Sequence, residues 1–210
     1  MRASLRYLIP TGEKPIYIAS TGGADAALSI QAEFEDREVE IFDARELDCS
    51  PSLDTHGFAL VPHTTSITDF YQFDDQRAHY EAEIKQLILE HTGASELLIF
   101  DHTLRSDSAE VRGEQATREP ASVIHNDYSD SSAERRLRDL VCTDEADRRI
   151  LRRYAIVNVW RTINHPIESS PLTCCDASTI PAGDLIASER RAAERVGELE
   201  LVAWNPDHRW

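Results

Sequence analysis

Short runs of β-branched and aromatic residues recur along this chain of 210 residues and constrain its fold more than any other feature. Such residues favour strands, and turn residues such as Gly, Pro, Asn and Asp separate the runs. The run at 154–161 is the longest and predicts a central strand with Trp160 in the core. The other expected strands lie at 15–19, 39–43, 96–100, 122–124, 172–176 and 198–204, with a last one opening at 208.

Two segments have a helical period instead. Between 74 and 93 the apolar residues from Tyr80 to Ile88 fall on one helical face, and Gly93 is suited to the C-terminal cap. A second helix is expected to begin at Ser131, which stands three residues before Glu134 in capping-box spacing. The sequence therefore combines many short strands with a few helices.

Two polar stretches are harder to assign. Residues 106–121 contain Gly and Pro and favour a long loop of the kind that forms a lid or a binding segment. The charged stretch 184–195 is expected to be helical in part. Neither stretch has a clear apolar period.

Charge and length limit the class of protein. With 38 acidic against 22 basic residues, the net charge of −16 repels a phosphate backbone, so nucleic acid is not an expected partner. No run approaches the ~18 apolar residues of a membrane helix, and the first residues lack a secretory signal, so we expect a cytoplasmic protein. Residues 1–210 have the length of a single domain.

His125 and Asp127 form the most informative local pattern. In an extended segment residues i and i+2 project to the same side, so both side chains can bind one metal ion. An imidazole and a carboxylate in this arrangement are two thirds of the facial triad that holds non-haem Fe(II). A surface histidine beside a helix-capping aspartate is the alternative interpretation.

Six ordered blocks of sequence share a resemblance with one protein family. The chain resembles the non-haem iron oxygenases that include gibberellin desaturase-like, cephem methoxylase-like and AsaB-like hydroxylases and desaturases. The blocks are 53–58 (LDTHGF), 99–105 (IFDHTLR), 124–128 (IHNDY), 157–161 (VNVWR), 171–176 (PLTCCD) and 205–210 (NPDHRW).

The resemblance implies a fold, cofactors and a reaction class. The fold is α+β and mainly β, with a jelly-roll (double-stranded β-helix) core and flanking helices. The implied cofactors are Fe(II) and 2-oxoglutarate, and the implied reaction is hydroxylation or desaturation of a small secondary metabolite. His125 and Asp127 match the first two iron ligands of the family.

The resemblance also implies strands after the block that ends at Trp210, which carry a third iron ligand, a His, and an Arg for 2-oxoglutarate. We therefore expect the domain to lack the family's last strands and to be incomplete at its C-terminal end. The alternative function is that of a catalytically inactive, truncated family member that acts at most as a binding or interaction protein, so the sequence leaves enzymatic activity open. His208 could replace the third ligand, or could be a surface histidine beside a turn.

Four further residues are candidates for the site. Arg105, at the end of an expected buried strand, could bind an acidic substrate or pair with a nearby acid. Tyr128 could form a hydrogen bond with the co-substrate or could pack in the core. Asn158 and Arg161 could contact the co-substrate or brace the metal site, and a buried arginine paired with an acid is the alternative. The substrate and the oligomeric state are not determined by the sequence.

Overall fold

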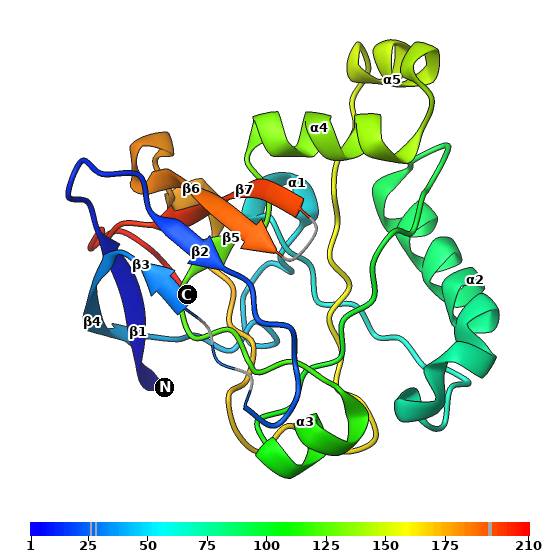
Figure 1. Ribbon diagram of the computed structural model, residues 1–210, viewed down its shortest axis with the longest axis horizontal. Helices are drawn as coiled ribbons and strands as arrows, with labels where there is room; N and C mark the ends of the chain where they lie inside the picture. The colour runs from blue at the N-terminus through cyan, green and yellow to red at the C-terminus, as the bar shows by residue number, and fades with distance from the viewer. Residues whose placement is uncertain (26, 28, 193–194) are drawn as a thin grey trace.

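The computed structural model describes residues 1–25, 27, 29–192 and 195–210, and its strands form two sheets (Figure 1). Strands β1 (Arg2–Ile9) and β4 (Glu33–Glu40) form an antiparallel pair. The other sheet has the order β3, β2, β6, β7, β5, in which β2 and β6 are parallel and the other neighbours antiparallel. Its strands are β2 (Ile16–Ile18), β3 (Ser29–Gln31), β5 (His125–Asn126), β6 (Leu185–Ala192) and β7 (Arg195–Val202).

The core lies where β1 meets β7. Tyr7 of β1 and Leu201 of β7 are completely buried, and a parallel bridge between Leu8 and Ala203 joins the two sheets. Val123, immediately before β5, packs into the same cluster as Leu8 and Leu201. Burial of a large apolar side chain contributes about 1.5–3 kcal/mol to the stability of the fold. The packing of Val123 against Leu8 and Leu201 therefore anchors the chain where β5 begins.

The helix predicted at 74–93 is confirmed as α2 (Phe73–Thr92). Gly93 caps it in the left-handed conformation, with φ of 64°, which glycine adopts without strain. Tyr80 and Ile84 form its buried face and pack with Ile67. In Figure 1, α2 lies on the opposite side of the molecule from the sheets.

The remaining helices are short. They are α1 (Leu53–His56), α3 (Ala109–Gln115), α4 (Asp130–Leu140) and α5 (Thr143–Ile150), with 3-10 turns η1 (Phe70–Gln72), η2 (Ala177–Thr179) and η3 (Ala182–Asp184). Helix α3 lies inside 106–121, so the prediction of a long loop over this whole stretch is wrong for residues 109–115. The Ser108 hydroxyl accepts a hydrogen bond from the Val111 amide and caps the first turn of α3.

Helix α4 begins two residues earlier than its sequence pattern indicates. Its N-cap is Ser129 rather than Ser131, and the capping box pairs Ser129 with Ser132 instead of using Glu134. The hydroxyls of Ser129 and Ser131 both donate to Glu198 of β7. Both serines contact Glu198, so what identifies Ser129 as the N-cap is the hydrogen bond that its hydroxyl accepts from the Ser132 amide.

The predicted strands at 96–100, 122–124, 154–161, 172–176 and 208–210 are not strands in the described part of the chain. A strand requires a hydrogen-bonded neighbour, and β propensity alone only indicates a chain suited to a half-buried, pleated surface. Trp160 is 49% exposed, so its expected place in the core is also wrong. The predicted strands at 15–19, 39–43 and 198–204 are represented by β2, the end of β4, and β7.

The expectation of partial helix at 184–195 is wrong for the residues that are described, because Leu185–Ala192 form β6. Residues 193 and 194 of that stretch lie outside the described residues. The pairing of β6 with both β2 and β7 overrides the helix propensity of its charged residues. No described helix has the length and apolar character needed to cross a membrane.

Candidate functional site

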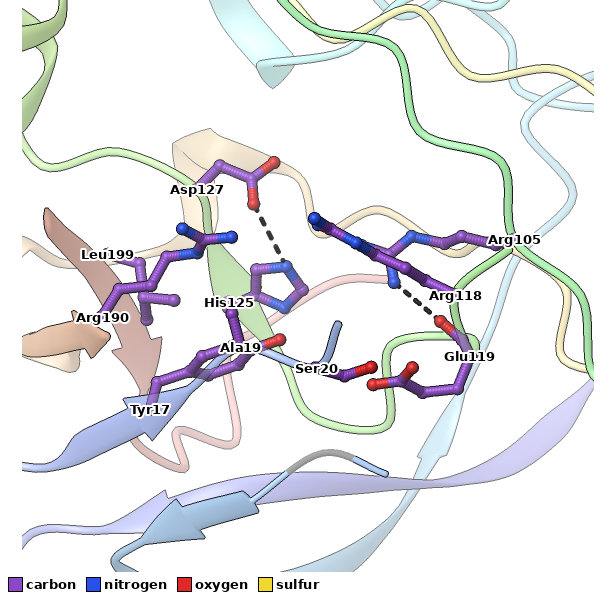
Figure 2. Close-up of a pocket in the computed structure, with 10 residues that line it drawn as sticks. All are labelled: Tyr17, Ala19, Ser20, Arg105, Arg118, Glu119, His125, Asp127, Arg190 and Leu199. Carbon is purple, nitrogen blue, oxygen red and sulfur yellow. Dashed lines mark hydrogen bonds and ion pairs between the residues drawn. The ribbon is translucent and has the colours of Figure 1, made fainter. Parts of the chain in front are cut away.

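His125 and Asp127 meet at the edge of the five-stranded sheet (Figure 2). His125 opens β5 and pairs with Leu201 in the middle of the core, which anchors its backbone. Its Nε2 lies 3.4 Å from Oδ1 of Asp127, and the two side chains are 18% and 47% exposed. The structure therefore brings the two expected ligands together at a place that solvent can reach.

The other ring nitrogen of His125 is held by the backbone. Nδ1 lies 2.9 Å from the carbonyl oxygen of Val123, which can only accept a hydrogen bond, so Nδ1 carries a proton. In the neutral ring this leaves the lone pair on Nε2, the atom that faces Asp127. Histidines that bind metal commonly donate their second ring N–H to a carbonyl in this way.

The charges of His125 and Asp127 are coupled. Burial alone would lower the pKa of His125, but the hydrogen bond and charge of Asp127, with the Val123 carbonyl, outweigh it and raise that pKa above its usual value. The hydrogen bond from His125 holds the pKa of Asp127 below its usual value against the effect of burial. Asp127 is thus ionised at neutral pH, the state in which a carboxylate binds metal.

Asn158 braces the same carboxylate. Its Nδ2 donates to Oδ2 of Asp127 at 2.5 Å, while Oδ1 faces His125. Asn158 belongs to the extended segment that was predicted to be the central strand, so a residue 31 positions away fixes the orientation of Asp127. This is the position that a residue supporting a metal ligand takes.

The donor set of this pair fits two positions of an iron site. One imidazole nitrogen and one carboxylate oxygen are ligands that suit Fe(II). Among the residues that the structure describes, no group of three or more His, Cys, Asp and Glu side chains is arranged to hold a metal ion. The described residues therefore place two side chains of suitable types together and add no third of these types.

A pocket surrounds the pair and is lined by three arginines. Arg105, which was predicted to bind substrate, lies there together with Arg118 and Arg190 (Figure 2). Nη1 of Arg105 donates to the carbonyl oxygen of Glu119 at 2.7 Å, so its alternative role in an ion pair with a nearby acid is not what the structure shows. Tyr17 of β2 forms another wall.

Tyr128 lies outside this pocket. Its ring packs edge-to-face on Phe100, with centroids 6.3 Å apart, and its hydroxyl accepts a hydrogen bond from Nε of Arg136. The guanidinium of Arg136 also lies over the ring of Phe100. Tyr128 therefore has a packing role, which is the alternative that the sequence left open.

Arg161 is also separate from the pocket. It lies over the ring of Phe70, 5.4 Å from the centroid, and Nη1 is 3.4 Å from Nδ1 of His63. Asn158 and Arg161 therefore point to different parts of the molecule, as the alternation of their segment predicts. The structure does not bring Arg161 to His125 and Asp127.

His208 is buried in another cluster. Its side chain is fully buried, Nε2 lies 3.1 Å from Oδ2 of Asp184, and its ring stacks on Tyr7. Asn205 donates to the same oxygen of Asp184. His208 is thus neither beside His125 nor a surface histidine, because the turn that precedes it folds its ring back into the core.

Comparison with known proteins identifies the family of this chain. The family model described as "Oxidoreductase/YMDC permease-like domain" matches residues 5–210. The chain belongs to this oxidoreductase family. Its hydroxylase and desaturase relatives confirm the resemblance that the sequence motifs indicate.

Two curated relatives illustrate the range of the family. The hydroxylase/desaturase CTB9 of Cercospora beticola is 31% identical over 171 residues, which cover 74% of this chain and 51% of the relative. The Fe(II)/2-oxoglutarate-dependent dioxygenase nvfI of Aspergillus novofumigatus is 30% identical over 155 residues, 70% of this chain and 54% of the relative. The chain therefore spans about half the length of these two relatives.

A solved structure has the same fold. The iron and alpha-ketoglutarate-dependent endoperoxidase NvfI superposes with a TM-score of 0.78 at 22% identity, covering 100% of this chain and 78% of that chain. The prediction of an α+β, mainly β fold with a jelly-roll core and flanking helices is confirmed by this shared fold.

Three of the residues that line the pocket beside His125 and Asp127 were not predicted from the sequence. Tyr17, Arg118 and Arg190 come from separate parts of the chain, and Tyr17 faces Arg190 across the parallel β2–β6 pair. No local spacing links them, because only the pairing of distant strands places them together. Composition does not single out the two arginines either, because arginine supplies 20 of the 22 basic residues of the chain.

Proposed function

We propose that this chain takes part in Fe(II)- and 2-oxoglutarate-dependent oxidation of a small secondary metabolite, by hydroxylation or desaturation. The observation that carries the proposal is the pairing of His125 Nε2 with Asp127 Oδ1 while Nδ1 of the histidine is tied to a backbone carbonyl. Support also comes from relatives named as hydroxylase/desaturase and as Fe(II)/2-oxoglutarate-dependent dioxygenase.

In this proposal His125 and Asp127 hold the iron. Fe(II) and 2-oxoglutarate, when bound, would activate molecular oxygen, which is the oxidant for breaking a C–H bond. The chain's own contribution is to orient the His125 ring through the contact of Nδ1 with the Val123 carbonyl, so that Nε2 faces the site, and to orient Asp127 through Asn158. An orientation that is fixed before metal binds reduces the free-energy cost of forming the site.

The alternative, a family member that only binds a ligand or a partner, is not favoured. Its relatives are named for oxidative activities. A purely structural role would also not require the imidazole and the carboxylate to remain accessible in a pocket.

Metal titration under nitrogen tests the proposal. Calorimetry with Fe(II), and with Mn(II) as a redox-silent surrogate, should give one site whose affinity rises when 2-oxoglutarate is added. Asp127→Ala should weaken that site at least about tenfold. Asp207→Ala, which removes an exposed carboxylate in a turn, is the matched control and should bind as the wild type does. Equal metal affinity in Asp127→Ala and the wild type would overturn the assignment.

A further inference from the structure

We propose that the pocket beside the His125–Asp127 pair selects a small molecule that carries a carboxylate next to a hydroxyl or amine. Arg118 and Arg190 bind the carboxylate, and Glu119 accepts a hydrogen bond from the neighbouring donor. As a statement about the substrate class of the oxidation, it rests on the proposed function.

The three arginines approach the pocket from two directions. In Figure 2, Arg190 enters from the side of β6, whereas Arg105 and Arg118 enter from the opposite side, with His125 and Asp127 between them. The backbone holds the second group in place, because Arg105 and Arg118 form a parallel β-bridge. A planar carboxylate matches the fork of donors on a guanidinium, so opposed guanidinium groups suit a carboxylate ligand.

The positive charge of the pocket is not neutralised by ion pairs. Among the described residues, the guanidinium groups of Arg118 and Arg190 make no hydrogen bond or salt bridge, and Arg105 donates only to a backbone carbonyl. This contrasts with Arg209, which pairs with Asp176. In a chain with 38 acidic residues and 22 basic ones, neighbouring arginines without an acidic partner indicate a site kept open for an anion.

The balance of charge within the pocket is opposite to that of the chain. Its three arginines face the carboxylates of Glu119 and Asp127, which leaves a formal charge of +1, whereas the whole chain carries −16. A metal ion bound by His125 and Asp127 would increase the positive charge further. The pocket therefore attracts an anion against the repulsion of the rest of the surface.

The arginine charges reach the walls of the pocket. Burial raises the pKa of Tyr17, and the positive charges of Arg105 and Arg190 oppose that rise. This agrees with the geometry, in which Tyr17 pairs with Arg190 across β2 and β6 and lines the pocket together with Arg105.

Glu119 calls for a hydrogen-bond donor on the ligand, which a carboxylate group does not supply. Its Oε2 is buried and has no hydrogen-bond partner among the described residues, although Glu119 lines the pocket. A buried acceptor without a donor costs free energy, and a ligand hydroxyl or ammonium group offsets that cost. A ligand with an acid and an adjacent donor satisfies both the arginines and Glu119.

Titration of the metal-free chain separates this inference from the metal site. The protein is stripped of metal by dialysis, and L-malate and succinate are the ligands, because both carry two carboxylates and only malate has a hydroxyl. Calorimetry should show tighter binding of malate. Arg118→Gln and Arg190→Gln should each weaken malate binding about tenfold. Arg135→Gln, at an exposed arginine on α4, makes the same charge change away from the pocket and should alter affinity less than twofold.

Further variants identify the role of each group. Glu119→Gln should remove the preference for malate over succinate. Absence of malate binding, or equal loss in Arg135→Gln and Arg190→Gln, would overturn the inference. If 2-oxoglutarate binds more tightly than malate and loses affinity in Arg190→Gln, the arginines serve the co-substrate and the substrate class is wrong. If the protein binds metal but not malate, the proposed function stands and this inference is rejected. If it binds malate but not metal, the ligand preference of the pocket stands and the proposed function is rejected.

Discussion

Nδ2 of Asn158 lies 2.5 Å from Oδ2 of Asp127 and donates a hydrogen bond to it. The other oxygen of the same carboxylate faces Nε2 of His125 at 3.4 Å. Asp127 is therefore held between an imidazole from the sheet edge and an amide from an extended segment outside the sheets. Each partner stabilises the ionised carboxylate, and together they fix the plane in which its oxygens lie.

Asn158→Ala should weaken metal binding about 10 to 100-fold with little change in thermal stability. The amide no longer orients Asp127, so part of the binding free energy is spent on ordering the carboxylate. Calorimetric titration with Mn(II) measures the effect. Thr162→Ala, at an exposed residue of the same extended segment, is the control and should bind metal normally. An unchanged affinity in Asn158→Ala would show that the amide has no role in the site.

The sequence predicts the pair well and the rest of the pocket poorly, for a physical reason. His125 and Asp127 are two positions apart, so backbone alternation alone places them on one side. Helix α2 is equally local, since its apolar period and its glycine cap lie within one segment. Arg190 depends on the pairing of β2 with β6, which no local pattern encodes. His208 was misjudged because its turn packs against Tyr7, at the other end of the chain.

The same argument explains why the strand predicted at 154–161 does not form. Its β-branched and aromatic residues are suited to a sheet, but strand pairing is a contact between distant segments. Val159 and Trp160 are 39% and 49% exposed, which shows that composition alone does not bury a segment. Of the two site candidates in this segment, Asn158 contacts Asp127, whereas Arg161 lies elsewhere.

Glu198 makes the stability of the protein depend on acid pH. Lys14 and the hydroxyls of Ser129 and Ser131 donate to its carboxylate and lower its pKa to about 2. A carboxyl with a lowered pKa in the folded state contributes stability that is present above its unfolded value of 4.5 and is lost as the pH falls towards 2.

Urea unfolding of wild type and Glu198→Gln at pH 6 and at pH 3 checks this dependence. At pH 6 the variant should be less stable by about 1–3 kcal/mol, because hydrogen bonds to a charged acceptor are lost. The difference should shrink at pH 3. Glu13→Gln, at an exposed glutamate, controls for the general loss of one acid and should follow the wild type. A difference that does not change with pH would show that Glu198 acts by shape and not by charge.

His208→Ala should destabilise the fold and leave metal binding unchanged. The fully buried ring contacts Tyr7 and Asp184, so its loss removes a buried hydrogen bond at a cost of about 1–3 kcal/mol and opens a cavity. Denaturant unfolding and Mn(II) titration of the same sample separate the two effects. His91→Ala, at an exposed position at the end of α2, should change neither. Loss of metal binding at full stability would instead make His208 a ligand.

The raised pKa of His125 predicts two opposite dependences on pH. In the metal-free protein the proton on this ring is stabilised by Asp127. A group whose pKa is raised on folding contributes stability that is fully present below its unfolded value, about 6.5, and lost as the pH rises through the folded value. Metal binding requires the neutral ring, so metal affinity should increase over the same range of pH in which that contribution is lost.

Both dependences can be measured between pH 5 and 9, within about the range over which a perturbed histidine titrates. Urea unfolding of metal-free wild type and of Asp127→Asn, which keeps the shape and removes the charge, isolates the stability term. Their difference should be largest at low pH and should decrease above neutrality. Mn(II) titration of the wild type should show affinity rising with pH, accompanied by proton release that disappears once the ring is neutral. Metal affinity that is flat across this range would mean that Nε2 of His125 does not bind the metal, and the site would have to be built from other groups.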